Sequence, residues 1–238
     1  MLDAVLPPLC PITGEPVSEA GNLSAGGWSQ LQFIDDPVCA ACGAPFAHDY
    51  GEGALCGSCL ASPPSFDRAR AAVTYDDASH KVIVAFKHAD RTDFAPMLGS
   101  WLARAGAPMA TARSILLPVP LHRRRLAERR FNQAAMIAEI AAEKLGCGYD
   151  PMALERTRAT MPQKELSEDA RKRNVSGAFG VRPGAGDLVK GAHIIVVDDV
   201  LTTGATISAC ARALKAAGAG RVDALVAARV VRHGQDAI

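Results

Sequence analysis

Several features that define large classes of protein are missing from this chain of 238 residues. It contains no run of 18 apolar residues, so it offers no transmembrane helix, and residues 1–8 lack the basic start of a secretory signal peptide. We therefore expect no membrane insertion and a cytoplasmic location. No internal repeat or low-complexity tract is visible in the sequence.

Positive charge is missing from the first part of the chain. Residues 1–67 contain eight acids and no Lys or Arg, which gives a charge of −8. The rest of the chain contains 26 basic and 17 acidic side chains and carries +9. The net charge of +1 therefore hides an acidic head on a basic body. A basic body suits a polyanionic ligand, either a phosphorylated sugar or a nucleic-acid strand.

The acidic head contains two C-x-x-C pairs, Cys39-Ala-Ala-Cys42 and Cys56-Gly-Ser-Cys59, separated by thirteen residues. This spacing is close to that of a zinc ribbon with four thiolate ligands, and we predict a structural zinc site. Two disulfides are disfavoured in a reducing cytosol, and a redox site expects one pair beside a strand and a helix. These two alternatives stay open but are less favoured.

The other candidate ligands in the chain are weaker. Cys10-Pro-Ile-Thr13 resembles a knuckle whose second cysteine is replaced by Thr13, which suggests a degenerate metal half-site. We expect His48 to be a solvated loop residue because four cysteines complete the zinc set. Cys147 and Cys210 are expected to be packing residues.

The most informative segment is residues 194–206. Four β-branched apolar residues predict a buried parallel strand, which ends on Asp198 and Asp199 and turns through a hydroxyl-rich loop into a helix. Ligands of α/β sheets bind at this carboxyl end. Unpaired N–H groups at the start of a helix hold phosphate, and the two acids suit sugar hydroxyls, directly or through hydrated Mg²⁺. Sites for a sugar diol and for a phosphate, one loop apart, predict that the ligand is a ribose 5-phosphate.

This segment resembles the 5-phosphoribosyl 1-pyrophosphate (PRPP) motif of type I phosphoribosyltransferases. The sequence contains no G-x-x-x-x-G-K-[ST] of a P-loop, and Gly204 stands alone where a Rossmann fingerprint needs three glycines. The alternative is an ordinary strand–helix turn with chance acids. The residues predicted to bind PRPP here are Asp198, Asp199, Thr202, Thr203, Gly204, Ala205 and Thr206.

Periodicity predicts further elements of an α/β domain: strands over 69–75 and 114–120, and helices over 76–87, 95–105 and 131–145. Residues 121–130, between the second strand and the last helix, contain five arginines. Because arginine contacts phosphate bidentately, this loop is a candidate pyrophosphate clamp, with Arg123, Arg124 and Arg129 as ligands. A solvated basic loop and a single-stranded nucleic-acid site are the alternatives.

Residues 156–175 combine Thr, Pro, Gln and Lys before a short helix expected near Ser167, which is typical of a mobile lid. Lys164, Arg171 and Arg173 are candidates to close over the pyrophosphate. A solvated helix face is an equally good explanation of these charges.

The motifs of the chain are, in order, the cysteine knuckles, Phe86-Lys87-His88, Pro-Val-Pro with its basic loop into Phe131-Asn-Gln-Ala, Gln163-x-x-Leu, and the Asp-Asp/Thr-Thr-Gly motif. The order of these motifs along the chain resembles that of the ComF family. The resemblance implies an α/β, parallel-sheet phosphoribosyltransferase domain preceded by a small zinc ribbon. We place these at residues 65–238 and 1–64. It also implies zinc and magnesium as cofactors and a link to DNA uptake in natural transformation.

The resemblance allows two functions. One is Mg-dependent transfer of a phosphoribosyl group to an unidentified nitrogen acceptor, with Asp198 and Asp199 as catalytic residues that favour the developing oxocarbenium ion. The other is a non-catalytic protein that senses PRPP or binds single-stranded DNA together with DNA-uptake proteins.

Overall fold

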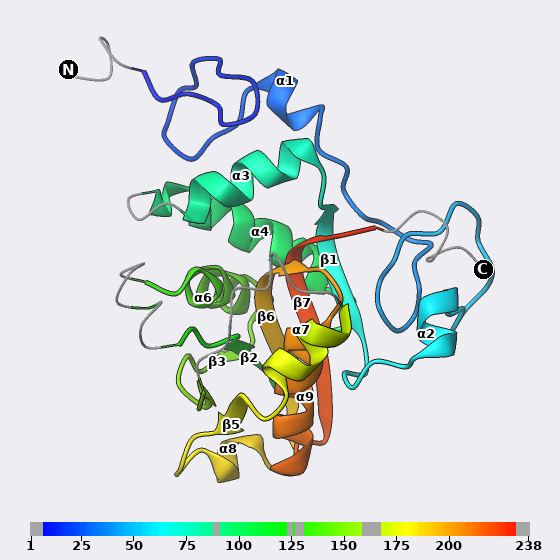
Figure 1. The fold of residues 1–238 in the computed structure, drawn as a ribbon. Coiled ribbons are helices and arrows are strands. Elements are labelled where there is room, and N and C mark those ends of the chain that lie inside the picture. Colours follow the sequence, from blue (N-terminus) through cyan, green and yellow to red (C-terminus); the bar gives the residue numbers. More distant parts are fainter. Residues whose placement is uncertain (1–6, 88–90, 123–125, 127–130, 159–167, 232–238) are drawn as a thin grey trace.

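The computed structural model (Figure 1) describes residues 7–87, 91–122, 126, 131–158 and 168–231. Its centre is a five-stranded sheet in the order β1-β7-β6-β2-β3, in which every neighbouring pair is parallel. These strands are β1 Ala69–Thr74, β2 Ser114–Pro118, β3 Gly148–Tyr149, β6 His193–Leu201 and β7 Arg221–Arg229. The predicted α/β class with a parallel sheet is confirmed.

Helices cover both faces of this sheet (Figure 1). One face packs against α3 Asp77–Lys87, α4 Ala95–Gly106, with its leading 3-10 turn η1 Thr92–Phe94, and α6 Gln133–Leu145. The other face packs against α7 Glu168–Val175, α8 Gly186–Val189 and α9 Ala205–Ala216, with the antiparallel pair β4 Leu154–Arg156 and β5 Phe179–Val181 beside them. The helices and strands expected in this domain therefore lie within a few residues of their predicted bounds. Among the described residues, no helix is long and apolar enough to cross a membrane.

Strand β6 shows why the sheet needs two covered faces. Ile195 and Val197 belong to the buried cluster under α4 and α6, whereas Ile194 and Val196 belong to the one under α9. This alternation follows from the period of two along a strand. The strand continues past the two acids to Leu201, because its pairing with β7 extends to Leu201 and Arg229. The prediction that the acids end the strand was therefore wrong by two residues.

A polar chain joins the amino ends of four strands. Ser114 Oγ lies 2.9 Å from His193 Nδ1, and His193 Nε2 lies 3.0 Å from Asp223 Oδ2. Arg221 and Arg68 also donate to the buried Asp223 carboxylate, at 3.0 and 3.5 Å. These contacts tie β1, β7, β6 and β2 together at the edge of the sheet opposite the two acids.

The acidic head folds as two small lobes, which we call the first lobe (residues 8–31, with α1 Ala25–Trp28) and the second lobe (residues 37–61, with α2 Gly57–Ala61). In Figure 1 the first lobe lies against α3, whereas the second lobe lies beside β1. Apolar residues of the first lobe join the cluster under α3 and α4, but the second lobe has a small buried cluster of its own. Ion pairs also connect the head with the body, namely Arg104–Asp35 and Lys215–Asp67, each at 2.7 Å.

Candidate functional site

The two acids of β6 lie at the carboxyl end of the sheet, beside the end of α3. Lys87, the last residue of α3, places its Nζ 2.8 Å from Asp199 Oδ2. Asp198 Oδ1 accepts a hydrogen bond of 2.9 Å from the Asp199 N–H. The structure therefore brings a cation from α3 to the predicted carboxylate pair.

The environment of Asp198 favours its neutral form. Burial and the charge of the neighbouring Asp199 together raise the pKa of this carboxyl to about 7, against the opposing effect of the Asp199 N–H, Lys87 and Arg156. A pKa near neutrality allows a bound cation or sugar hydroxyl to control whether the site is charged. Asp198 and Asp199 thus differ in their surroundings although they are adjacent.

The predicted phosphate loop connects β6 with α9. Gly204 has a φ of +73°, in the left-handed region that favours glycine, and a Cβ atom at this position would lie 3.4 Å from the Phe66 ring. The N-cap of α9 is Gly204 itself, which has no side chain to cap the helix. The Ala205 N–H is oriented towards Thr203 Oγ1 at 3.4 Å. A helix start in a hydroxyl-rich loop is suited to a phosphate group.

A cavity of about 500 Å³ lies between this loop and the second lobe. The loop contributes one wall through residues 201–205, and Cys42, Ser58 and Cys59 of the second lobe contribute another. Arg212 and Arg229 line it as well, and no acidic side chain does so within the described part of the chain. The second lobe therefore forms part of the surroundings of the phosphate loop.

The structure brings together only part of the predicted site. Asp198, Asp199, Thr202, Thr203, Gly204, Ala205 and Thr206 lie on one strand–loop–helix unit. Arg123, Arg124, Arg129 and Lys164 lie outside the described residues, so their predicted roles stay predictions. Sequence reasoning did not assign Lys87 or Arg156 to the site, because both come from other elements. The motif Phe86-Lys87-His88 was the one signal for Lys87.

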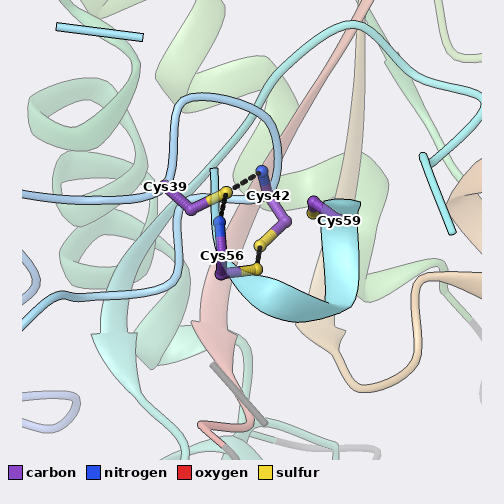
Figure 2. A group of neighbouring side chains, drawn as sticks. All are labelled: Cys39, Cys42, Cys56 and Cys59. Atoms are coloured by element: carbon purple, nitrogen blue, oxygen red, sulfur yellow. Dashed lines mark hydrogen bonds between the residues drawn. The ribbon is translucent and has the colours of Figure 1, made fainter. Parts of the chain in front are cut away.

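Four cysteines of the second lobe converge on one point (Figure 2). The Sγ atoms of Cys39, Cys42, Cys56 and Cys59 all lie within 4.8 Å of one another. The Cys42 and Cys56 sulfurs are 3.6 Å apart, close to the separation of about 3.8 Å that tetrahedral ligands 2.3 Å from zinc require. The Cys39 sulfur also accepts from the Cys42 and Cys56 N–H groups, at 3.5 and 3.3 Å. This lobe has the geometry of a zinc ribbon.

The chemistry of the set also fits zinc. Burial and repulsion from Cys42 and Cys39 together raise the pKa of the Cys56 thiol to about 11. A divalent cation is therefore needed for these crowded thiols to ionise together. Arg70 Nη1 lies 3.5 Å from the Ala40 carbonyl, and the buried Arg229 donates to the Cys42 carbonyl, so two strands of the sheet hold the first knuckle.

The remaining cysteine and histidine predictions can be compared with the structure. Cys210 is fully buried in the cluster under α9, which confirms it as a packing residue, and Cys147 is partly buried. His48 is exposed and lies outside the four-cysteine group, as expected. Cys10 is buried.

Comparison with known proteins agrees with this architecture. Residues 1–60 match the model of the double zinc ribbon domain, and residues 132–236 match that of the phosphoribosyl transferase domain. The DNA utilization protein YhgH of Salmonella typhimurium is 34% identical over 190 residues, which cover 78% of this chain and 81% of that protein. Competence protein ComFC of Bacillus subtilis is 24% identical over 193 residues, 78% of this chain and 75% of that protein. The chain belongs to the ComF family.

This ComF-family chain is also similar to a second YhgH protein and, distantly, to a solved structure. YhgH of Escherichia coli K12 is 33% identical over 211 residues, which cover 84% of this chain and 90% of that protein. Among solved structures, the allosteric regulatory enzyme of purine biosynthesis matches 56% of this chain and 25% of its own, with 22% identity and a TM-score of 0.37. A likeness this distant supports no conclusion about function.

Proposed function

We propose that the protein binds PRPP and transfers its phosphoribosyl group to a nitrogen acceptor in a Mg-dependent reaction. The observation that carries the proposal is the combination of two acids near the end of β6 with a hydroxyl-rich loop that leads into α9 at Ala205, six residues after Asp199. The carboxylates suit the ribose hydroxyls, and the loop of residues 202–206 suits the 5-phosphate. The phosphoribosyl transferase domain match covers the same unit.

The proposed site uses its own residues in distinct ways. Asp198 and Asp199 hold the ribose, and their negative charge favours the positive charge that develops on the sugar ring as pyrophosphate leaves. Lys87 must turn away from Asp199 before that carboxylate binds a ligand, since their charged atoms are 2.8 Å apart. The oxygen donors of the pair fit Mg²⁺, which when bound supplies charge neutralisation for the pyrophosphate.

The residues proposed to hold the leaving group lie outside the described ranges. We assign the pyrophosphate to Arg123, Arg124 and Arg129, and we assign closure of the site to the lid that carries Lys164. A reducing compartment such as the cytoplasm suits the four zinc thiolates, and for this reason we place the protein there.

Calorimetric titration with Mg-PRPP tests the ligand. The wild type should bind, and Asp199→Asn should weaken binding at least tenfold because it removes a charged ligand of the ribose or the metal. Asp187→Asn, an exposed change on α8, is the matched control and should leave affinity unchanged. Equal affinity of all three proteins would refute the proposed site.

A pyrophosphate-release assay tests turnover. Mg-PRPP should release pyrophosphate in the presence of at least one base, amine or nucleic acid of an acceptor panel. Binding without any release would instead favour a non-catalytic role.

That second role is supported by the names of the relatives, which include DNA utilization protein and competence protein F. In this reading the protein senses PRPP or binds single-stranded DNA, and it acts with DNA-uptake proteins. Fluorescence anisotropy with a labelled single strand should then show an affinity that falls steeply with salt. Changing Arg123, Arg124 and Arg125 to Ala should abolish it, whereas the exposed pair Arg113→Ala and Arg182→Ala should reduce it only slightly. Intact binding by the triple variant would exclude the basic loop as the DNA site.

A further inference from the structure

The two lobes of the head repeat one backbone pattern. Residues 8–17 and 37–46 each form a tight loop closed by an antiparallel bridge, Leu9 with Pro16 and Val38 with Pro45. The hydrogen bonds inside the loops correspond one to one: Cys10 N–H to Glu15 O at 2.8 Å and Cys39 N–H to Ala44 O at 2.8 Å; Gly14 N–H to Cys10 O at 2.9 Å and Gly43 N–H to Cys39 O at 2.9 Å. The glycine of each turn has a left-handed φ, +75° and +69°. Cys10 therefore occupies the position of the zinc ligand Cys39, and Thr13 that of Cys42.

The second half of each lobe repeats as well. Ser24 is the N-cap of α1, just as Cys56 is the N-cap of α2, and the residue three positions later lies inside each helix. Ser24 therefore corresponds to Cys56, and Gly27 corresponds to Cys59. The sequence concealed this correspondence, because neither Ser24 nor Gly27 resembles a metal ligand.

The four corresponding positions of the first lobe also meet at one point. Thr13 Oγ1 lies 2.9 Å from Ser24 Oγ. A Cβ atom on Gly27 would lie 2.7 Å from Cys10 Sγ, so the fourth corner is filled by the close approach of the Gly27 backbone. The Cys10 thiol accepts backbone hydrogen bonds from Thr13 and Ser24, as Cys39 does from Cys42 and Cys56. The first lobe thus keeps the backbone arrangement of the zinc-binding lobe but carries different side chains at the four ligand positions.

This set of atoms does not fit zinc. One sulfur remains, two neutral hydroxyls replace two thiolates, and glycine offers no ligand at all, whereas structural zinc needs four S or N donors. We propose that the first lobe is a zinc ribbon without metal, in which hydrogen bonds among Cys10, Thr13 and Ser24 replace the ion. The protein then carries one zinc per chain, although its head belongs to a double zinc ribbon domain.

Apolar packing supplies the support that the metal would otherwise give. Ile12, Leu23 and Leu31 are buried in one cluster with residues of α3 and α4. Lys81 of α3 donates a hydrogen bond of 3.0 Å to the Ile12 carbonyl. In the second lobe the buried cluster consists of three cysteines and Ala44, and the larger Phe46 and Leu55 that pack against it are only partly buried, so the lobe lacks an equivalent substitute for zinc.

The zinc content of the purified full-length chain tests the proposal. Mass spectrometry of metals should find one zinc per chain in the wild type and in Cys10→Ser, and none in Cys39→Ser. Two zinc ions per chain in the wild type, or loss of zinc from Cys10→Ser, would overturn the proposal.

Restoring the ligands gives an independent test. The triple change Thr13→Cys, Ser24→Cys and Gly27→Cys should raise the content to two zinc ions and double the cobalt–thiolate absorbance after substitution with Co²⁺. Thr13→Cys alone is the control and should stay at one. The Cys10 side chain must rotate to admit the new Cβ at position 27. A folded triple variant that still binds one metal would show that the two lobes are not equivalent; if the triple variant fails to fold, the wild-type zinc content still decides.

Discussion

The first and second lobes have the same backbone pattern and different means of support. In the second lobe, four sulfurs meet within 4.8 Å and little else is buried. In the first lobe, one sulfur remains and three apolar side chains join the main core. The difference indicates that a ribbon packed against a larger domain can fold without metal. Buried apolar surface then supplies the stabilisation that metal–ligand bonds would otherwise give.

The two lobes also face different parts of the candidate site. The first lobe contacts α3, whose last residue Lys87 is paired with Asp199. The second lobe forms a wall of the cavity beside the phosphate loop. Metal should therefore control the phosphate side of the site and leave the α3 side intact.

Removal of zinc should have the largest effect. Chelation, or Cys39→Ser, should unfold the second lobe, since structural zinc contributes about 10–16 kcal/mol of apparent binding energy in small zinc peptides. Hydrogen exchange should lose protection over residues 37–61 and keep it over 8–31, and Mg-PRPP affinity should fall with the second lobe. Loss of protection in both lobes together would contradict the contrast between them.

Truncation of the first lobe's core should have the next largest effect. Ile12 is 5% exposed, and Ile12→Ala should lower the free energy of unfolding by about 2–4 kcal/mol. Urea denaturation should give the same loss with and without chelator, because no metal is involved. Leu60→Ala, at a 62% exposed position of the second lobe, is the control and should change stability by about 0.5 kcal/mol or less.

The stability of the protein should depend on pH through Asp198. Because the pKa of Asp198 is raised to about 7 in the folded protein, its stabilising contribution is complete below about pH 4 and is lost as the pH rises through 7. Asp198→Asn should therefore be more stable than the wild type at pH 8, by about 2–4 kcal/mol, and nearly equal to it at pH 4. Thermal unfolding across this range measures the difference. A stability difference that does not vary with pH would contradict the raised pKa.

Removal of the α3 cation should have the smallest effect. Lys87 and Asp199 are partly exposed, and such a pair contributes about 1 kcal/mol or less. Lys87→Met should tighten binding of Mg²⁺ alone about two- to fivefold, since the competing cation is gone. Calorimetry should give the same ratio of Mg²⁺ affinities, Lys87→Met to wild type, after zinc is removed, because the first lobe and not the second packs against α3. A ratio that depends on zinc would mean that the second lobe supports α3 too.

Local signals made most of the fold predictable. Residues 194–206 contain their own strand, turn glycine and helix start, so one stretch of sequence was sufficient for this unit. The four zinc cysteines were equally clear, because C-x-x-C spacing is a property of a single turn.

What could not be predicted depends on contacts between distant segments. Lys87 reaches Asp199 across more than a hundred residues, and Arg229 reaches the Cys42 carbonyl from the end of β7. The sequence indicated only the first half of the repeat in the head, the knuckle at Cys10 and Thr13; the half at Ser24 and Gly27 was missed because neither residue is a metal ligand and the remaining likeness is one of backbone conformation. Sequence patterns report side chains, whereas this repeat is preserved in the main chain.

The polar chain of Ser114, His193 and Asp223 fixes the amino ends of the strands relative to one another, so positions along β6 can be counted from this common origin. Ser114 and His193 face each other in register, and His193 pairs in turn with Arg221. Asp198 lies five residues beyond this origin and Asp199 six, so the two acids are directed to opposite faces. One residue inserted between His193 and Asp198 would exchange their faces, directing Asp199 away from Lys87. The number of residues between His193 and the two acids therefore decides, by being odd or even, which acid faces Lys87.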